Sequence, residues 1–123
     1  MTNQFVEDTL NKLADVYENR FEGVVYFNTE EKELAELQKK ETVELPVFVF
    51  GTTNAVEDNK LVVPVIGIVS KGLREDFIKE TLIKYTPKRL KGCKVQKLKN
   101  SDFTITEKSE FISVNYNLEF LFN

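Results

Sequence analysis

The sequence predicts an α+β fold in which a mainly antiparallel sheet, containing a long β-hairpin, is packed by two amphipathic helices. Three observations lead to this prediction. Apolar residues recur at helical spacing in two segments, two apolar segments flank a polar turn, and the segment Ile112–Phe122 alternates in polarity. The chain has 123 residues, of which 41% are hydrophobic and 30% charged, and we take residues 1–123 as one domain.

The N-terminal quarter is predicted to begin with a helix over Asn3–Asn19, because apolar side chains recur there every three or four residues. Gly23 breaks that pattern, and the apolar residues Val24–Phe27 follow as a short strand. The segment Asn28–Lys40 is highly charged. We predict a short surface helix there, and a mobile loop is the alternative.

Two strands, Val43–Gly51 and Lys60–Ser70, are predicted to form the hairpin around the polar segment Thr52–Asn59. Both strands are almost continuously apolar, so either helices cover both faces or another subunit covers one of them. We hypothesise an intersubunit surface here and expect one of the two phenylalanines to point into the core and the other outward. The residues of this hypothetical interface are Phe48, Phe50, Val63 and Val65.

The C-terminal half is predicted to contain a second helix and three strands. The helix, Gly72–Tyr85, has its apolar residues on one side (Leu73, Phe77, Ile78, Thr81, Leu82 and Tyr85) and is stopped by Thr86-Pro87. A basic strand follows over Leu90–Lys99 and a short strand over Phe103–Thr106. In the final strand we expect the intervening polar residues to face water and six residues to face the core: Ile112, Val114, Tyr116, Leu118, Phe120 and Phe122.

Charge is distributed unevenly along the chain. Seven basic residues and no acidic residue lie between Lys84 and Lys99, although the whole chain has 17 basic and 20 acidic residues. Three interpretations are open: a solvated lysine-rich strand that protects a sheet edge, an acidic protein partner, or nucleic acid. Sequence-specific DNA reading is not expected, because lysines predominate and no aromatic residues are interleaved with them. The residues predicted to face the anionic partner or DNA are Lys88, Arg89, Lys91, Lys94, Lys97 and Lys99.

The charged segment before the hairpin is rich in glutamate and so has a charge opposite to that of residues 84–99. Glu33 and Glu36 belong to a group of glutamates that either forms a solvated helix face or supplies the acidic side of a head-to-tail contact with the basic segment of another copy. These two residues therefore complete the set of hypothetical interface residues.

The residue inventory argues against familiar catalytic and metal sites. The chain has no histidine and one cysteine, which excludes Ser-His and Cys-His nucleophile pairs and every histidine-containing metal site. No glycine-rich phosphate loop is present. Cys93 is interpreted as a structural thiol, with a nucleophile whose pKa is lowered by neighbouring lysines as the alternative. We expect no enzyme activity, no cofactor and no metal. The longest apolar run, Leu61–Val69, is too short to cross a bilayer, so we expect no membrane contact.

The order of elements resembles that of the tail terminator (tail-completion, head-tail joining) proteins of long-tailed bacteriophages. The similarity lies in an N-terminal amphipathic helix, the strand Leu45–Phe50 in a long hairpin, a second helix at Gly72–Tyr85, and terminal strands ending in Ser113–Phe120. The resemblance implies a non-enzymatic virion protein that forms a hexameric ring at the end of the tail tube. It also implies contact with tail tube and neck or connector proteins, non-specific contact with DNA in the lumen, and assembly in the host cytoplasm.

Two other functions stay open at this point. One is a small phage-encoded binding module or inhibitor that occupies a host protein through a charged face. The other is a carboxylate-dependent enzyme, although no pair among the acidic residues stands out as catalytic.

Overall fold

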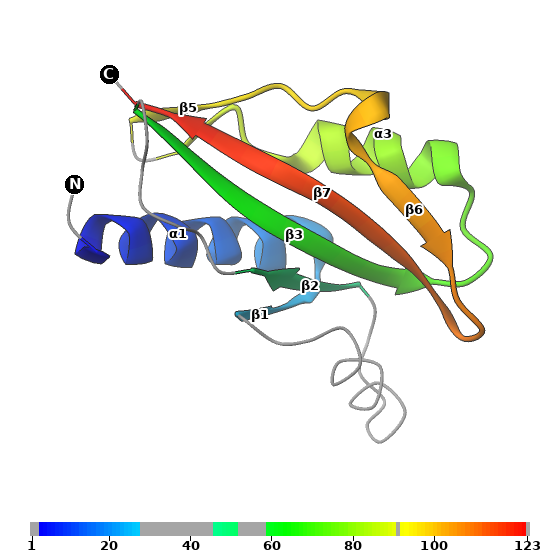
Figure 1. Ribbon diagram of the computed structural model, residues 1–123. Coiled ribbons are helices and arrows are strands. Elements are labelled where there is room, and N and C mark those ends of the chain that lie inside the picture. The colour runs from blue at the N-terminus through cyan, green and yellow to red at the C-terminus, as the bar shows by residue number, and fades with distance from the viewer. Residues whose placement is uncertain (1–2, 28–45, 52–58, 91, 123) are drawn as a thin grey trace.

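The computed structural model describes residues 3–27, 46–51, 59–90 and 92–122. Two helices and seven strands lie in this part of the chain, and the α+β prediction is confirmed (Figure 1). In chain order the elements are α1 (Asn3–Phe21), β1 (Val24–Phe27), β2 (Val47–Phe50), β3 (Lys60–Ser70), α3 (Glu75–Tyr85), β4 (Arg89–Leu90), β5 (Cys93–Val95), a 3₁₀ turn (Asn100–Asp102), β6 (Thr104–Glu107) and β7 (Phe111–Leu121).

The strands form one sheet in the order β1-β2-β3-β7-β5-β4, and β6 also pairs with β7. Its centre is the antiparallel pair β3 and β7, which runs in register from Lys60 opposite Leu121 to Ser70 opposite Phe111. The hairpin prediction is confirmed for the described strands, because β2 pairs antiparallel with β3 from Val47 opposite Ile68 to Phe50 opposite Val65. The one parallel pair among the described strands is β1 with β2.

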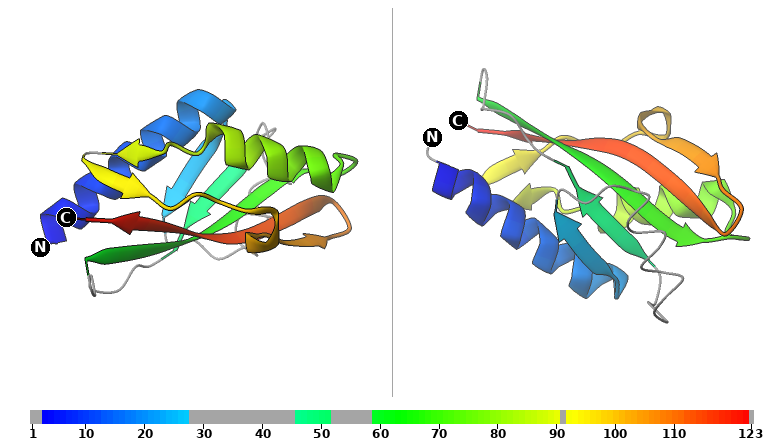
Figure 2. Two further views of the ribbon diagram at one scale, coloured as in Figure 1. Left: turned by 90° about the horizontal axis from the view of Figure 1, so that it is seen from above. Right: turned by 60° about the horizontal axis from the view of Figure 1, so that its bottom comes forward.

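Both helices cover the same face of the sheet, as the left view of Figure 2 shows. Leu13 and Tyr17 of α1, and Ile78 and Leu82 of α3, pack against residues of β2, β3 and β7 in one apolar cluster. The core positions predicted for the last strand are confirmed from Ile112 to Phe120, none of which is more than 5% exposed. Strict alternation places these side chains on the face that the helices cover.

The predicted interface residues of the hairpin are core residues. Phe48 and Phe50 are two positions apart on one strand, so both point to the same face, and the expectation that one of them points outward is wrong. Both rings pack against the ring of Tyr17, with centroids 4.8 and 5.4 Å apart. Val63 and Val65 belong to the same cluster, and none of the four residues is more than 1% exposed.

The opposite face of the hairpin is also buried. Val47, Val49 and Ile68 form a separate buried cluster there, with Tyr26, Ile66 and Phe111 packed around it. These three core members are at most 2% exposed. The continuous apolar character of β2 therefore reflects two buried faces within one chain, and no second subunit is needed to explain it.

Other boundaries differ from the predictions for local reasons. The basic segment is not one strand over Leu90–Lys99, because β4 and β5 pair as a tight hairpin in which Arg89 faces Lys94. Gly92 has a φ of +80°, a conformation that permits this turn at low cost. Ser113 does not face water. It lies between β3 and β6 and is fully buried.

The second helix begins at Glu75 and not at Gly72, whose φ is +101°. Part of the predicted organisation lies outside the described residues: the segment Asn28–Lys40 with Glu33 and Glu36, the start of the strand Val43–Gly51, most of the loop Thr52–Asn59, and Lys91.

Candidate interaction surfaces

The described part of the chain contains no cluster of three or more acidic or cysteine side chains that could hold a metal ion. Cys93 is 2% exposed on β5, and burial raises the pKa of its thiol. A raised thiol pKa lowers the thiolate population at neutral pH, which is the property of a structural cysteine and not of a nucleophile. The interpretation of Cys93 as a structural thiol is consistent with this environment.

A chain of hydrogen-bonded hydroxyls lies in the core. Tyr17 Oη lies 2.8 Å from Tyr116 Oη and 3.1 Å from Thr86 Oγ1, and Thr86 donates to the Leu82 carbonyl at 2.6 Å. Burial raises the pKa of Tyr17 to about 12 and raises the pKa of Tyr116 well above its ordinary value. These hydroxyls link α1, the end of α3 and β7, so their position fits a role in holding the elements together.

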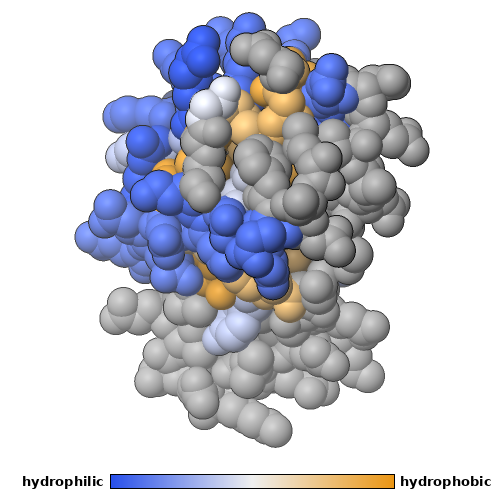
Figure 3. All heavy atoms as spheres, turned by 90° about the vertical axis from the view of Figure 1, so that its left-hand side faces the viewer, coloured by the Kyte–Doolittle hydropathy of each residue, from blue (hydrophilic) through white to orange (hydrophobic). Residues whose placement is uncertain are grey.

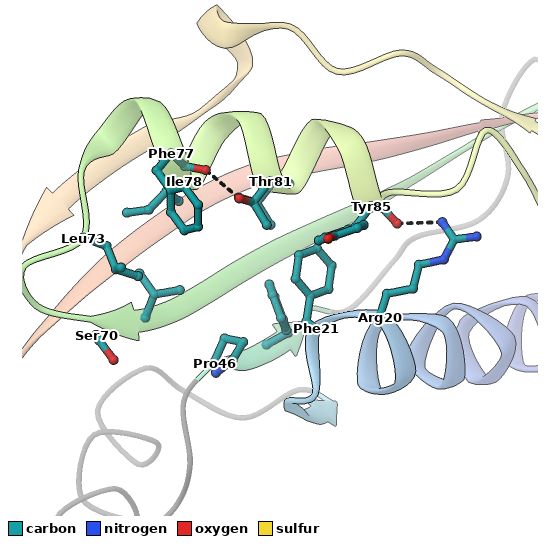
Figure 4. Close-up of a pocket in the computed structure, with 12 residues that line it drawn as sticks. Arg20, Phe21, Pro46, Ser70, Leu73, Phe77, Ile78, Thr81 and Tyr85 are labelled. Atoms are coloured by element: carbon teal, nitrogen blue, oxygen red, sulfur yellow. Dashed lines mark hydrogen bonds between the residues drawn. The ribbon is translucent and has the colours of Figure 1, made fainter.

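An apolar groove of about 220 Å³ lies between the C-terminal end of α1, helix α3 and the end of β3 (Figure 4). The described residues that line it include one charged side chain, Arg20, and no acidic one. The Arg20 guanidinium donates to the Tyr85 carbonyl oxygen at 2.8 Å, which fixes the cation at one end of the groove. The lining residues are Arg20, Phe21, Pro46, Phe48, Val69, Ser70, Leu73, Phe77, Ile78, Thr81, Leu82 and Tyr85.

The rim of this groove carries apolar side chains that the fold leaves exposed. Leu73, Phe77 and Tyr85 are 39%, 56% and 36% exposed, and they are three of the five large apolar side chains exposed in the described ranges. Tyr85 stacks at a right angle on Phe21 of α1, with centroids 5.5 Å apart. A volume of about 220 Å³ is below the range of about 300–1,000 Å³ typical of small-molecule clefts. The groove therefore suits side chains of another protein better than a cofactor.

The basic residues between 84 and 99 form a strip along the end of α3, the β4–β5 hairpin and the extended segment after it. We call this the basic strip; its described members are all exposed: Lys84, Lys88, Arg89, Lys94, Lys97 and Lys99. The ion pairs found in the described part of the chain are Lys60 with Glu119, Lys71 with Glu107, and Arg74 with Asp76, so none involves the strip.

Like charges even face one another within the strip. Arg89 on β4 stands directly opposite Lys94 on β5, an arrangement that destabilises a sheet by several tenths of a kcal/mol. Figure 3 shows the end of the molecule at which α1 begins and β7 ends in Figure 1, where hydrophilic residues cover most of the coloured surface around smaller apolar areas. The like charges of the basic strip, which form no ion pair in the described part of the chain, suit an anionic partner.

The structure agrees only in part with the site residues predicted from the sequence. The predicted basic residues that the structure describes are all exposed, and Arg89 lies opposite Lys94, whereas Lys91 is not described. The sequence does not indicate the groove, because Leu73, Phe77 and Tyr85 belong to the same apolar stripe of the predicted helix as the core residues. In the structure only Ile78 and Leu82 of that stripe are buried. The width of the stripe was the available signal, since it exceeds what one contact with a sheet can cover.

Comparisons of the chain with protein-family models, curated proteins and solved structures found no match. Neither α1 nor α3 is long and apolar enough to cross a membrane.

Proposed function

We propose that this protein is a non-enzymatic structural subunit that works by surface contacts, and specifically that it forms a ring at the end of a phage tail tube and joins the tail to the head or neck. The basic strip is the observation that supports the proposal most. Six exposed cations without an ion pair in the described part of the chain repel one another, and an anionic partner in direct contact offsets that repulsion.

Two surfaces of different chemistry also fit a subunit of a ring. A ring closes through a heterologous contact, which requires two different complementary patches on each subunit. The basic strip is one charged patch, and the groove beside α3 is an apolar patch on another side. In this proposal the strip faces either an acidic surface of the neighbouring subunit or DNA in the lumen.

The alternative function is a small binding module that occupies another protein through its charged face. The groove favours this alternative specifically, because an apolar groove with an arginine at one end can receive a side chain of any partner and needs no ring. The two functions differ in the size of the native particle: a ring subunit assembles alone or on tail tubes, and a binding module stays small.

The test compares the native chain with a variant in which Lys94, Lys97 and Lys99 are changed to Gln. We expect the variant to fold normally, because all three side chains are exposed, and to assemble or bind duplex DNA more weakly and with a smaller dependence on salt. Sedimentation across a salt series measures assembly, and fluorescence anisotropy of a labelled duplex over the same series measures DNA binding.

The matched control removes three lysines outside the strip, namely Lys12, Lys79 and Lys108, and so changes net charge equally. If both variants assemble with the salt dependence of the native chain, the strip is only a solvated sheet edge and the proposal loses its main support.

A further inference from the structure

The exposed side of α3 forms a regular ridge. Phe77, Thr81 and Tyr85 follow one another at intervals of four residues, so their side chains lie in one row along the helix. Figure 4 shows them on the side of α3 that borders the groove. The outer two are large and 56% and 36% exposed, whereas the central residue is small. Rows of this spacing are the ridges by which one helix packs on another, and a small central residue allows two helices to approach closely.

The two ends of α3 carry opposite charge. Glu75 and Asp76 lie in its first turn, Lys79 and Glu80 lie near its midpoint, and Lys84 lies in its last turn. Glu75, Glu80 and Lys84 form no ion pair in the described part of the chain, and Lys84 Nζ lies over the Tyr85 ring. Arg74, at the acidic end, already has Asp76 at 3.9 Å. A second α3 packed antiparallel on the first therefore brings each acidic end against a basic end, and the opposed helix dipoles favour the same orientation.

We propose that a second copy of this chain docks on α3 through a two-fold contact centred on Thr81. In this arrangement Phe77 of each copy packs beside the partner's Tyr85, at the end of the groove where Arg20 is held by the Tyr85 carbonyl. Glu80 of each copy approaches the partner's Lys84. A two-fold contact needs a self-complementary surface. The ridge of α3 provides one because it has an aromatic residue at each end, Phe77 and Tyr85, and because Glu80 of one copy lies within reach of Lys84 of the other.

This contact differs in symmetry from the contact that the proposed function requires. A two-fold contact closes on itself and gives a dimer, whereas a ring requires a heterologous contact. The basic hairpin and the segment after it take no part in the contact, which leaves most of the basic strip uncovered. The contact does occupy one wall of the groove that the proposed function counts as an apolar patch, because Phe77, Thr81 and Tyr85 line that groove.

Sedimentation equilibrium of the full chain tests the proposal, with a reversible dimer of the 14.3 kDa monomer as the expected result. Thr81→Arg should weaken dimerisation at least about tenfold, because two guanidinium groups then face each other at the two-fold axis. Phe77→Gln should weaken it by a similar factor, because an exposed aromatic anchor is removed from both copies. Val62→Thr is the matched control, since Val62 is 38% exposed on β3, away from α3, and this variant should dimerise like the native chain.

A charge exchange tests the antiparallel orientation. Glu80→Lys should weaken the dimer, because it sets like charges against the partner's Lys84, and adding Lys84→Glu to the same chain should restore it. Circular dichroism melts verify that each variant is folded. Failure of the second change to restore the dimer overturns the orientation, and a native chain that sediments only as a monomer overturns the contact.

The formation of particles larger than a dimer distinguishes the two proposals. If Thr81→Arg dimerises like the native chain and still forms a ring, the two-fold contact is overturned and the proposed function is left intact. A dimer that is lost in Thr81→Arg, in a chain that never forms a ring alone or on tail tubes, supports the contact and removes the proposed function.

Discussion

Removing the Tyr17 hydroxyl should destabilise the protein more than removing the Tyr116 hydroxyl, although the two atoms are hydrogen-bonded to each other. A hydroxyl has one hydrogen to donate, and that of Thr86 is used on the Leu82 carbonyl at 2.6 Å. Tyr17 must therefore donate to Thr86 across their 3.1 Å contact, and Tyr116 must donate to Tyr17 at 2.8 Å. The chain of donors runs in one direction, from Tyr116 through Tyr17 and Thr86 to the Leu82 carbonyl.

The expected losses in the free energy of unfolding follow from the direction of hydrogen-bond donation. Tyr116→Phe removes the first donor and leaves no donor without an acceptor, which should cost about 1 kcal/mol. Tyr17→Phe removes two hydrogen bonds and leaves the Tyr116 hydroxyl without a partner at a residue that is 4% exposed. Two lost bonds and one buried unsatisfied hydroxyl should together cost about 2–4 kcal/mol of the free energy of unfolding.

Urea unfolding followed by far-ultraviolet circular dichroism measures both costs, and the double variant supplies the decisive comparison. Adding Tyr116→Phe to Tyr17→Phe removes the unsatisfied hydroxyl, so the second change should cost nothing further or should recover part of the loss. If the two costs are equal, or if they add in the double variant, the donors do not run from Tyr116 toward the Leu82 carbonyl.

Three further outcomes are expected. Because the pKa values of Tyr17 and Tyr116 are raised in the folded state, their contribution to stability is complete below about pH 10. The contribution of Tyr17 should be lost as the pH rises to about 12, and that of Tyr116 should also be lost at alkaline pH; alkaline unfolding of the native chain and of the Phe variants measures this. Phe48→Ser and Phe50→Ser should each cost at least about 3–5 kcal/mol, as urea unfolding will show, and a variant that stays fully stable would contradict their placement in the core. Truncation after Asn115 removes half of β7 and should abolish the cooperative thermal transition, whereas a transition close to that of the full chain would be incompatible with the central place of this strand.

The accuracy of sequence-based prediction differed between β7 and β2 for a physical reason. The last strand was predicted well because one of its faces is buried by helices, so period-two alternation reports burial at the apolar positions from Ile112 to Phe120, while Ser113 is buried against the pattern. In β2 all four residues are buried, so alternation is absent and the sequence cannot say which face meets which element. The hypothesis of an intersubunit hairpin arose from that ambiguity.

Neither the pairing of strands distant in the sequence nor the groove could be predicted from local sequence patterns. The parallel pairing of β1 with β2 depends on how the chain passes Gly23, where a Cβ would collide with the Pro46 carbonyl oxygen. The groove depends on the place where α1 ends against α3, which no local periodicity encodes. What the sequence did contain was an apolar stripe on α3 wider than its contact with the sheet, from Leu73 to Tyr85.

Charge is the property that connects the two proposals, and it also allows them to be separated. Lys84 belongs both to the basic strip and to the proposed two-fold contact, so a variant of Lys84 alone tests neither of them cleanly. Lys94, Lys97 and Lys99 belong only to the strip, and Glu80 belongs only to the contact. The triple change to Gln should therefore alter DNA binding or ring assembly and leave the dimer unchanged, while Glu80→Lys should do the reverse. If either set of changes shifts both measurements equally, the charges act through the field of the whole molecule, and the assignment of separate surfaces must be given up.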